Sequence, residues 1–130
     1  MASLRQEISV NAPLDHVWAA LRDFGAVHQR VVPGFVVDSK LDGEARIVTF
    51  FNGMTAREEL VSIDDAQHRV AYAIVGGTAK HYNGAAQVFA DGADKCRVVW
   101  TIDILPNELA GPVGQMQKQG ARVMKETLDR

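Results

Sequence analysis

Cysteine, excess charge and long apolar runs are all scarce in this sequence. The chain has one cysteine, Cys96, so an intrachain disulfide is excluded and a reducing, cytoplasmic location is expected. No apolar run approaches the ~20 residues of a membrane-spanning helix, and the opening stretch, MASLRQEISV, lacks the apolar segment of a signal peptide. The net charge of −2 gives no electrostatic footprint for nucleic acid or an anionic membrane. We therefore expect neither as a partner.

Motifs for metals and nucleotides are also missing. The chain has 4 histidines, and their positions lack metal-ligand spacing. There is no P-loop, dinucleotide fingerprint or nucleophile elbow. We therefore expect no metal site and no cofactor.

The length and composition indicate a folded protein. A chain of 130 residues, 47% of them hydrophobic, can bury a core without metals or disulfides, and this composition excludes disorder. No linker, internal repeat or low-complexity segment divides the chain. We expect residues 1–130 to form a single domain, either as a monomer or as a homodimer.

The N-terminal part of the chain predicts one strand followed by two helical pieces. Apolar and polar residues alternate with period two over Leu4–Val10, which is typical of a strand. Helical spacing follows, with Asn11 as the expected cap and Pro13 in the first turn. This helix is expected to end near Phe24-Gly25, and a short helical or irregular piece, Ala26–Val32, is expected next.

The rest of the chain predicts six more strands and a final helix. The expected strands, separated by short turn sequences, are Phe35–Leu41, Ala45–Phe51, Met54–Ile63, Arg69–Val75, His81–Ala90 and Cys96–Leu105. Connections this short imply antiparallel neighbours. After Gly111-Pro112, helical spacing of apolar residues continues to the terminus. The fold class is therefore α+β, with a curved seven-stranded antiparallel sheet wrapped around a long C-terminal helix and two short helices after the first strand. Such a layout often leaves a ligand cavity between helix and sheet.

The hairpin at Asn52-Gly53 decides which charged side chains share a face. A two-residue turn would pair Phe51 with Met54 and separate Arg46 from Glu58. A three-residue loop, Asn52 to Met54, would pair Phe51 with Thr55 and bring Arg46, Val48, Glu58 and Leu60 to one face. Apolar alternation leaves both registers open, because Val61 and Ile63 compete with Leu60 for the inward side.

An ordered set of short motifs resembles a known superfamily. They are NAPxxxVW at Asn11–Trp18, DFG at Asp23–Gly25, Pro33-Gly34, GxxR at Gly43–Arg46, ExL at Glu58–Leu60, Asp64-Asp65, and Tyr72 ahead of the VGG run at Val75–Gly77. Over the whole chain the sequence resembles the START-like (SRPBCC) superfamily. Within it, the sequence resembles the polyketide cyclase/dehydrase and lipid transport branch, whose helix-grip fold is shared with birch-pollen-type allergens.

Two groups within this superfamily are similar in particular stretches. Residues 60–77 resemble abscisic acid receptors, but the connection around Asn52-Gly53 is shorter than the receptors' gating loop, and TAKHY at residues 78–82 lacks their latch motif. A gated hormone receptor is therefore not expected. The GxxR and ExL motifs resemble lachrymatory factor synthase, and the resemblance implies that Arg46 and Glu58 form a buried ion pair and favours the three-residue loop, which we adopt. The alternative is an ordinary exposed cross-strand pair.

Further residues are expected to line the cavity. Tyr72, Tyr82 and Trp100 lie on the inward phase of their strands, and each would offer a polar atom or simply complete the core. Met116, Gly120 and Met124 form the apolar stripe of the last helix, where a mid-helix glycine suggests either space for a ligand or close packing. Gly84 and Ala86, opposite, also suggest room.

Two functions remain open at this stage. The first is a carrier or sensor that binds a small hydrophobic or aromatic molecule, with Arg46, Glu58, Tyr72, Tyr82, Trp100, Met116, Gly120 and Met124 as the ligand-binding residues. The second is an enzyme of the polyketide cyclase, dehydrase or isomerase type. In that case Glu58 would be the acid or base, and Arg46 would pair with an oxyanion or carboxylate.

Overall fold

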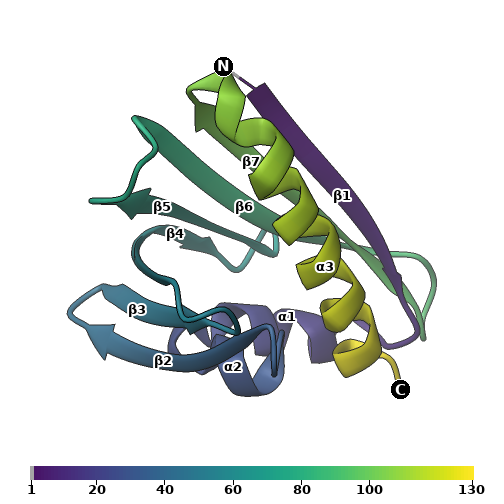
Figure 1. Cartoon of the computed structure of the whole chain (residues 1–130). Helices are drawn as coiled ribbons and strands as arrows, with labels where there is room; N and C mark the ends of the chain where they lie inside the picture. Colours follow the sequence, from purple (N-terminus) through teal and green to yellow (C-terminus); the bar gives the residue numbers. More distant parts are fainter. Residues whose placement is uncertain (1) are drawn as a thin grey trace.

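The seven strands form one antiparallel sheet in the order β1-β7-β6-β5-β4-β3-β2 (Figure 1). The computed structural model describes residues 2–130. The strands are β1 (Ala2–Val10), β2 (Val36–Asp42), β3 (Ala45–Phe50), β4 (Thr55–Asp64), β5 (Arg69–Val75), β6 (His81–Ala90) and β7 (Cys96–Leu105). The first and last strands in the sequence are neighbours, because β1 pairs with β7 along its whole length. The predicted α+β, helix-grip class is confirmed.

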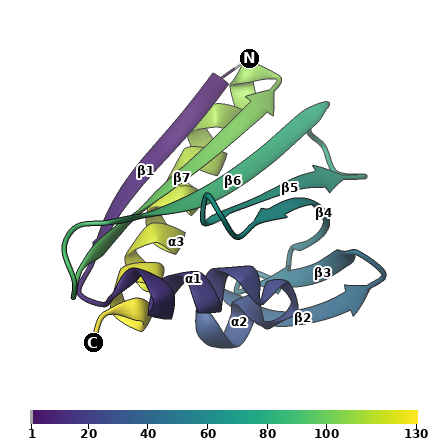
Figure 2. The same cartoon turned by 180° about the vertical axis from the view of Figure 1, so that it is seen from behind.

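The helices lie on one side of this curved sheet. They are α1 (Leu14–Arg22), α2 (Val27–Arg30) and α3 (Ala110–Leu128), with short 3₁₀ turns η1 (Phe24–Ala26) and η2 (Asn107–Leu109). α3 crosses the concave face next to β1 and β7, and α1 with α2 lies at one end of the sheet (Figure 1). The reverse view shows the outer face of the sheet in front of α3 (Figure 2). In the described part of the chain, no helix is both long and apolar enough to traverse a bilayer.

Alternation of side chains puts the core between the sheet and α3. Along β7 the inward residues Val98, Ile102 and Ile104 are at most 1% exposed, as period-two geometry requires. In β4 a bulge between Leu60 and Ser62 shifts this phase. Both Leu60 and Ile63 therefore pack against the core. The sequence pattern alone left open which of these two residues faces inward.

The expected cap of the first helix is wrong. Pro13 occupies the N-cap position, and no side chain caps the helix. The backbone N–H of Asn11 instead donates to Asp129 Oδ1 at 2.8 Å, and the Asn11 carbonyl accepts from the Arg130 N–H at 2.9 Å. Asn11 therefore holds the C-terminal end of the chain against the end of β1. The helix also ends at Arg22, slightly earlier than predicted.

The last helix begins at Ala110, so Gly111-Pro112 lies inside its first turn. A proline is tolerated there because the first turn's N–H groups have no intrahelical partner.

Candidate functional site

Four residues, Phe51 to Met54, lie between β3 and β4, and the backbone pair of Phe50 with Met54 closes a three-residue loop, Phe51 to Gly53. The Phe50 N–H donates to the Met54 carbonyl at 2.8 Å, and Thr49 pairs with Thr55. Gly53 has φ +86°, the left-handed conformation that such loops require after a turn. The predicted pairing of Phe51 with Thr55 is wrong, because the Phe51 N–H leaves the ladder and donates to the Phe35 carbonyl at 3.0 Å. The predicted sharing of one face by Arg46 and Glu58 is confirmed by the register.

Arg46 and Glu58 form a buried ion pair on the inner face of this hairpin. The two residues are directly paired across the ladder and are 8% and 6% exposed. Arg46 Nε and Nη2 both lie 2.7 Å from Glu58 Oε1. Charge-assisted hydrogen bonds of this kind are among the strongest in proteins. An exposed cross-strand pair is thereby excluded.

The Arg46 guanidinium also interacts with residues other than Glu58. Its Nη1 donates to the Phe24 carbonyl at 3.0 Å, so Nε and Nη1 each have a hydrogen-bond acceptor, and Nη2 is in ion-pair contact with Glu58. The Arg46 Cζ also lies 3.9 Å from the centroid of the Phe24 ring and 5.4 Å from that of Tyr72, within the range of cation–π attraction. Glu58 Oε2, in contrast, receives no hydrogen bond from any of residues 2–130.

Tyr72, Trp100 and Gln117 form a second polar group beside the ion pair. The indole Nε1 of Trp100 donates to the Tyr72 hydroxyl at 3.1 Å, and Gln117 Nε2 on α3 donates to the Trp100 carbonyl at 3.1 Å. Burial, followed by the charge of Glu58, raises the pKa of the Tyr72 phenol. Tyr72 is therefore a neutral hydroxyl at physiological pH.

A small, partly open pocket of about 70 Å³ connects these polar groups with apolar side chains from the sheet, α1, α2 and α3. It is lined by Leu21, Val27, Val31, Val32, Phe35, Val36, Arg46, Val48, Phe50, Glu58, Val70, Tyr72, Ala86, Trp100 and Met124. We refer to this space as the chamber. Its two charged side chains form the Arg46–Glu58 pair.

The structure brings five of the eight predicted ligand-binding residues to the chamber. Arg46, Glu58, Tyr72, Trp100 and Met124 line it. The other three, Tyr82, Met116 and Gly120, are not among its lining residues; Tyr82 and Met116 pack as partly buried side chains against the core.

The space expected beside Gly120 and Gly84 is filled. A Cβ on Gly120 would lie 3.1 Å from both the Phe35 and the Trp100 ring, and a Cβ on Gly84 would meet the Tyr72 ring. Each glycine is therefore needed for close approach of an aromatic ring, and neither leaves room for a ligand.

Three residues of the site were not foreseen from the sequence. Phe24 supplies the carbonyl and the ring that hold Arg46, Phe35 contacts the chamber from the segment before β2, and Gln117 fixes Trp100. Gln117 is only 2% exposed. Nothing in the sequence distinguishes Gln117 from its neighbours Gln115 and Gln119 on the same helix, whereas Phe24 belongs to the DFG motif.

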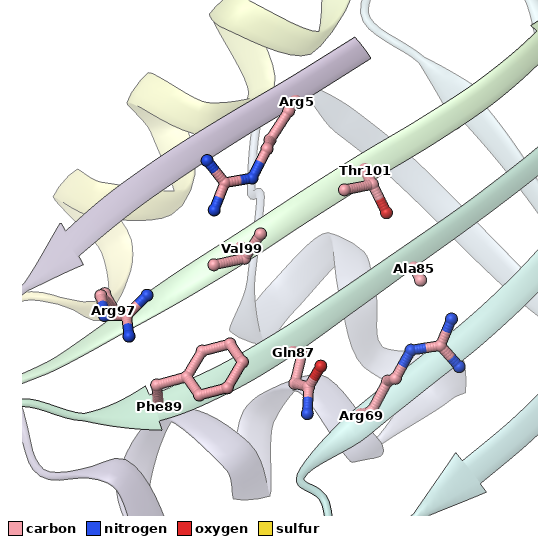
Figure 3. A pocket seen from close by; sticks show the side chains of 8 residues that line it. All are labelled: Arg5, Arg69, Ala85, Gln87, Phe89, Arg97, Val99 and Thr101. Carbon is pink, nitrogen blue, oxygen red and sulfur yellow. The ribbon is translucent and has the colours of Figure 1, made fainter. Parts of the chain in front are cut away.

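A larger hollow of about 170 Å³ lies on the outer face of the sheet (Figure 3). Arg5, Arg69 and Arg97 surround it, on β1, β5 and β7. Two of these arginines are already paired with carboxylates, since Glu7 lies 3.3 Å from Arg5 and 3.4 Å from Arg97, and Asp91 lies 3.5 Å from Arg97. The hollow lies on the outer face of the sheet, whereas the chamber contains a buried ion pair, so we assign the candidate site to the chamber. Across residues 2–130, no three His, Cys, Asp or Glu side chains gather as metal ligands would.

Solved structures with the same fold are numerous. An uncharacterised protein from Bacillus thuringiensis matches with a TM-score of 0.86 and 18% identity, covering 98% of each chain. A protein from Thermobifida fusca matches with a TM-score of 0.79 and 26% identity, covering 97% of this chain and 92% of that one. The Zhui aromatase/cyclase from Streptomyces sp. R1128 matches with a TM-score of 0.70 and 18% identity, covering 98% of this chain and 90% of that one.

Sequence comparison adds the family. No protein with a curated description matches the chain. The family model described as polyketide cyclase / dehydrase and lipid transport, however, matches residues 1–130. The chain therefore belongs to the polyketide cyclase/dehydrase and lipid transport family.

Proposed function

We propose that the protein binds a small hydrophobic or aromatic molecule in the chamber, with the Arg46–Glu58 pair as its polar end. The observation that carries this proposal is that only one of the two Glu58 carboxylate oxygens has a partner in the protein. Oε1 accepts a hydrogen bond from Arg46 Nε and lies 2.7 Å from Arg46 Nη2, whereas Oε2 has no donor among residues 2–130. A buried ion pair contributes little net stability, because the cost of desolvating the two charges offsets their attraction. A spare carboxylate oxygen in an apolar chamber is a natural contact for a ligand.

The size of the chamber sets a condition on this binding. A cavity of roughly 150 Å³ holds benzene, whereas the chamber measures about 70 Å³. An aromatic ligand therefore requires a side chain to move. Phe35 is the best candidate, because it lies on the irregular segment between α2 and β2. The centroid of its ring lies 5.6 Å from that of Phe50 and 5.9 Å from that of Phe51.

The proposal is tested by titrating benzene into ¹⁵N-labelled protein. We expect shifts concentrated at amides of residues that line the chamber, such as Ala86 and Met124. Phe35→Ala widens the chamber and should tighten benzene binding at least several-fold. Phe51→Ala is the matched control, because Phe51 is 46% exposed and does not line the chamber. Benzene that leaves the chamber amides of both the native protein and Phe35→Ala unshifted would contradict binding at this site.

An enzyme of the cyclase, dehydrase or isomerase type is the second candidate, favoured by the same free oxygen. Glu58 Oε2 would take a proton from a carbon next to a carbonyl group and return it elsewhere. Arg46 would hold the Glu58 carboxyl group in position through its contacts with Oε1. Membership of a family described by cyclase and dehydrase activity supports this alternative.

Exchange of carbon-bound hydrogen separates the two candidates. In D₂O, an enzyme of this kind should accelerate deuteration of the methyl group of acetophenone, measured by NMR. Glu58→Gln should abolish the acceleration while binding remains. Acetophenone that binds in the chamber but exchanges no faster than in buffer supports a carrier or sensor.

A further inference from the structure

Within residues 2–130, the edge strand β2 pairs with β3 alone. Figure 1 shows it at the open end of the sheet, whereas the other edge strand, β1, packs against α3. Both ends of β2 expose a large apolar side chain, since Val37 is 54% and Leu41 is 64% exposed. An unpaired edge of this kind is a template for a further strand.

The backbone of β2 has unused hydrogen-bonding groups near its middle. A two-residue turn, Gly43-Glu44, joins β2 to β3 and makes Asp42 and Ala45 a hydrogen-bonded pair. Hydrogen-bonded and non-hydrogen-bonded pairs alternate along an antiparallel ladder. Ser39 and Leu41 therefore direct their N–H and C=O groups away from β3, where a second strand can bind them.

The charges on β2 are self-complementary about Ser39. Asp38 and Lys40 flank this serine and lie on the same face of the sheet. Neither has an ion-pair partner within residues 2–130. A two-fold axis at Ser39 sets Asp38 of each copy opposite Lys40 of the other. The same axis brings the exposed Val37 of each copy to Leu41 of the other.

Neighbouring positions of the axis are unfavourable. An axis at Asp38 or Lys40 would place that charge opposite its own copy, which destabilises a ladder. Ser39 is small and uncharged, and its Oγ is buried without a hydrogen-bond partner among residues 2–130. Serines opposite each other in a ladder can share a hydrogen bond, and rotation about χ1 turns the Ser39 hydroxyl towards its copy.

We propose that the protein forms a homodimer by antiparallel pairing of two β2 strands about a two-fold axis at Ser39. The two sheets then join into one, and the same patch is used on both copies, as a closed two-fold dimer requires. One strand pair is smaller than the usual stable interface. The dimer is therefore weak and forms at micromolar or higher concentrations.

Sedimentation velocity of the full chain, from micromolar to millimolar concentration, tests the proposal. The native protein should change from monomer to dimer as the concentration rises. Lys40→Asp places like charges opposite each other twice, and it should raise the dissociation constant of the dimer at least about tenfold. Lys118→Asp is the matched control, because it changes the net charge equally at an exposed position of α3. It should dimerise as the native protein does.

Exchange of charges identifies the register. Asp38→Lys should also prevent self-association, but an equimolar mixture of the Asp38→Lys and Lys40→Asp proteins should form a heterodimer, because opposite charges then face each other across the axis. The double variant Asp38→Lys/Lys40→Asp restores complementarity within one chain and should dimerise like the native protein. Circular dichroism shows whether each variant is folded.

Amide hydrogen exchange gives a readout on the native protein without any substitution. The Ser39 amide should be protected at millimolar concentration and exchange rapidly in dilute solution, whereas the Lys40 amide, which bonds β3, is protected in both. A protein that stays monomeric at millimolar concentration would overturn the proposal. A dimer that Lys40→Asp leaves intact, or exchange at Ser39 that does not depend on concentration, would place the interface elsewhere and overturn it too.

Discussion

Arg46 and Glu58 face each other across the β3–β4 ladder and are held together by two contacts of 2.7 Å to a single carboxylate oxygen. Both side chains are almost fully buried. Because each charge is compensated mainly by the other, the two residues should behave as one unit in their effect on stability.

The first prediction concerns removal of one partner. Arg46→Met leaves Glu58 as a buried, uncompensated carboxylate, and it should lower the free energy of unfolding by about 3–5 kcal/mol. The double variant Arg46→Met/Glu58→Leu should recover most of this loss. Urea denaturation measures both variants.

An exposed pair that links β4 to the end of β2 provides the control. Arg57 and Asp42 lie 2.6 Å apart, but their side chains are 40% and 66% exposed. Arg57→Met should therefore cost less than about 1 kcal/mol. Similar losses for Arg46→Met and Arg57→Met would contradict the view that burial makes the first pair special.

The second prediction compares two glycines on α3. Gly120→Ala places a Cβ 3.1 Å from the Phe35 and Trp100 rings, and such overpacking typically costs about 1–3 kcal/mol. Gly114→Ala meets only a Leu4 side-chain atom at 3.8 Å, so it should gain most of the ~1 kcal/mol that alanine offers over glycine in a helix. Thermal unfolding should rank Gly114→Ala above the native protein and Gly120→Ala below it. The reverse order would show that Phe35 and Trp100 yield easily.

Much of the architecture was predictable because alternation and turn residues are local properties. The strand segments follow period-two patterns, and short turn sequences separate them. The family resemblance also indicated that Arg46 and Glu58 share a face. The exact register was beyond local reasoning, since it depends on a long-range bond in which the Phe51 N–H donates to Phe35 instead of to β4.

The candidate site was less predictable than the fold. Glycines at positions 84 and 120 were compatible with either an empty space or a close contact, and only the positions of Tyr72, Phe35 and Trp100 distinguish the two. Asn11 has the side chain of a helix cap, but its backbone is used by Asp129 at the far end of the chain. Contacts between distant segments, which no local pattern encodes, decided each case.

The third prediction concerns Gly84 and the orientation of Tyr72. A Cβ at this position would overlap the Tyr72 ring, so Gly84→Ala should force the ring away and break its hydrogen bond with Trp100. We expect a loss of stability of about 1–3 kcal/mol and a changed near-ultraviolet circular dichroism spectrum. Gly77→Ala is the control, because nothing lies within 4 Å of its added Cβ. An unchanged aromatic spectrum in Gly84→Ala would contradict the packing described for Tyr72.

The last prediction is a dependence of stability on pH at the C-terminal end. The pKa of Asp129 is lowered from its ordinary value of 3.8, first by the hydrogen bond from the Asn11 backbone N–H and then by Lys125. A carboxyl group with a lower pKa in the folded state stabilises the protein above 3.8, and this contribution disappears as the pH falls through the folded pKa.

Asp129→Asn isolates this contribution, because it keeps an acceptor for Asn11 but has no proton to gain. It should be less stable than the native protein by about 1 kcal/mol at neutral pH, and the difference should close as the pH falls well below 3.8. Glu126→Gln, at an exposed position of the same helix, serves as the control for loss of one negative charge. Urea denaturation over a range of pH measures all three proteins. A gap between the native protein and Asp129→Asn that stays constant over this range would contradict the assignment, because a contribution from ionisation must disappear once the carboxyl group is protonated in both states.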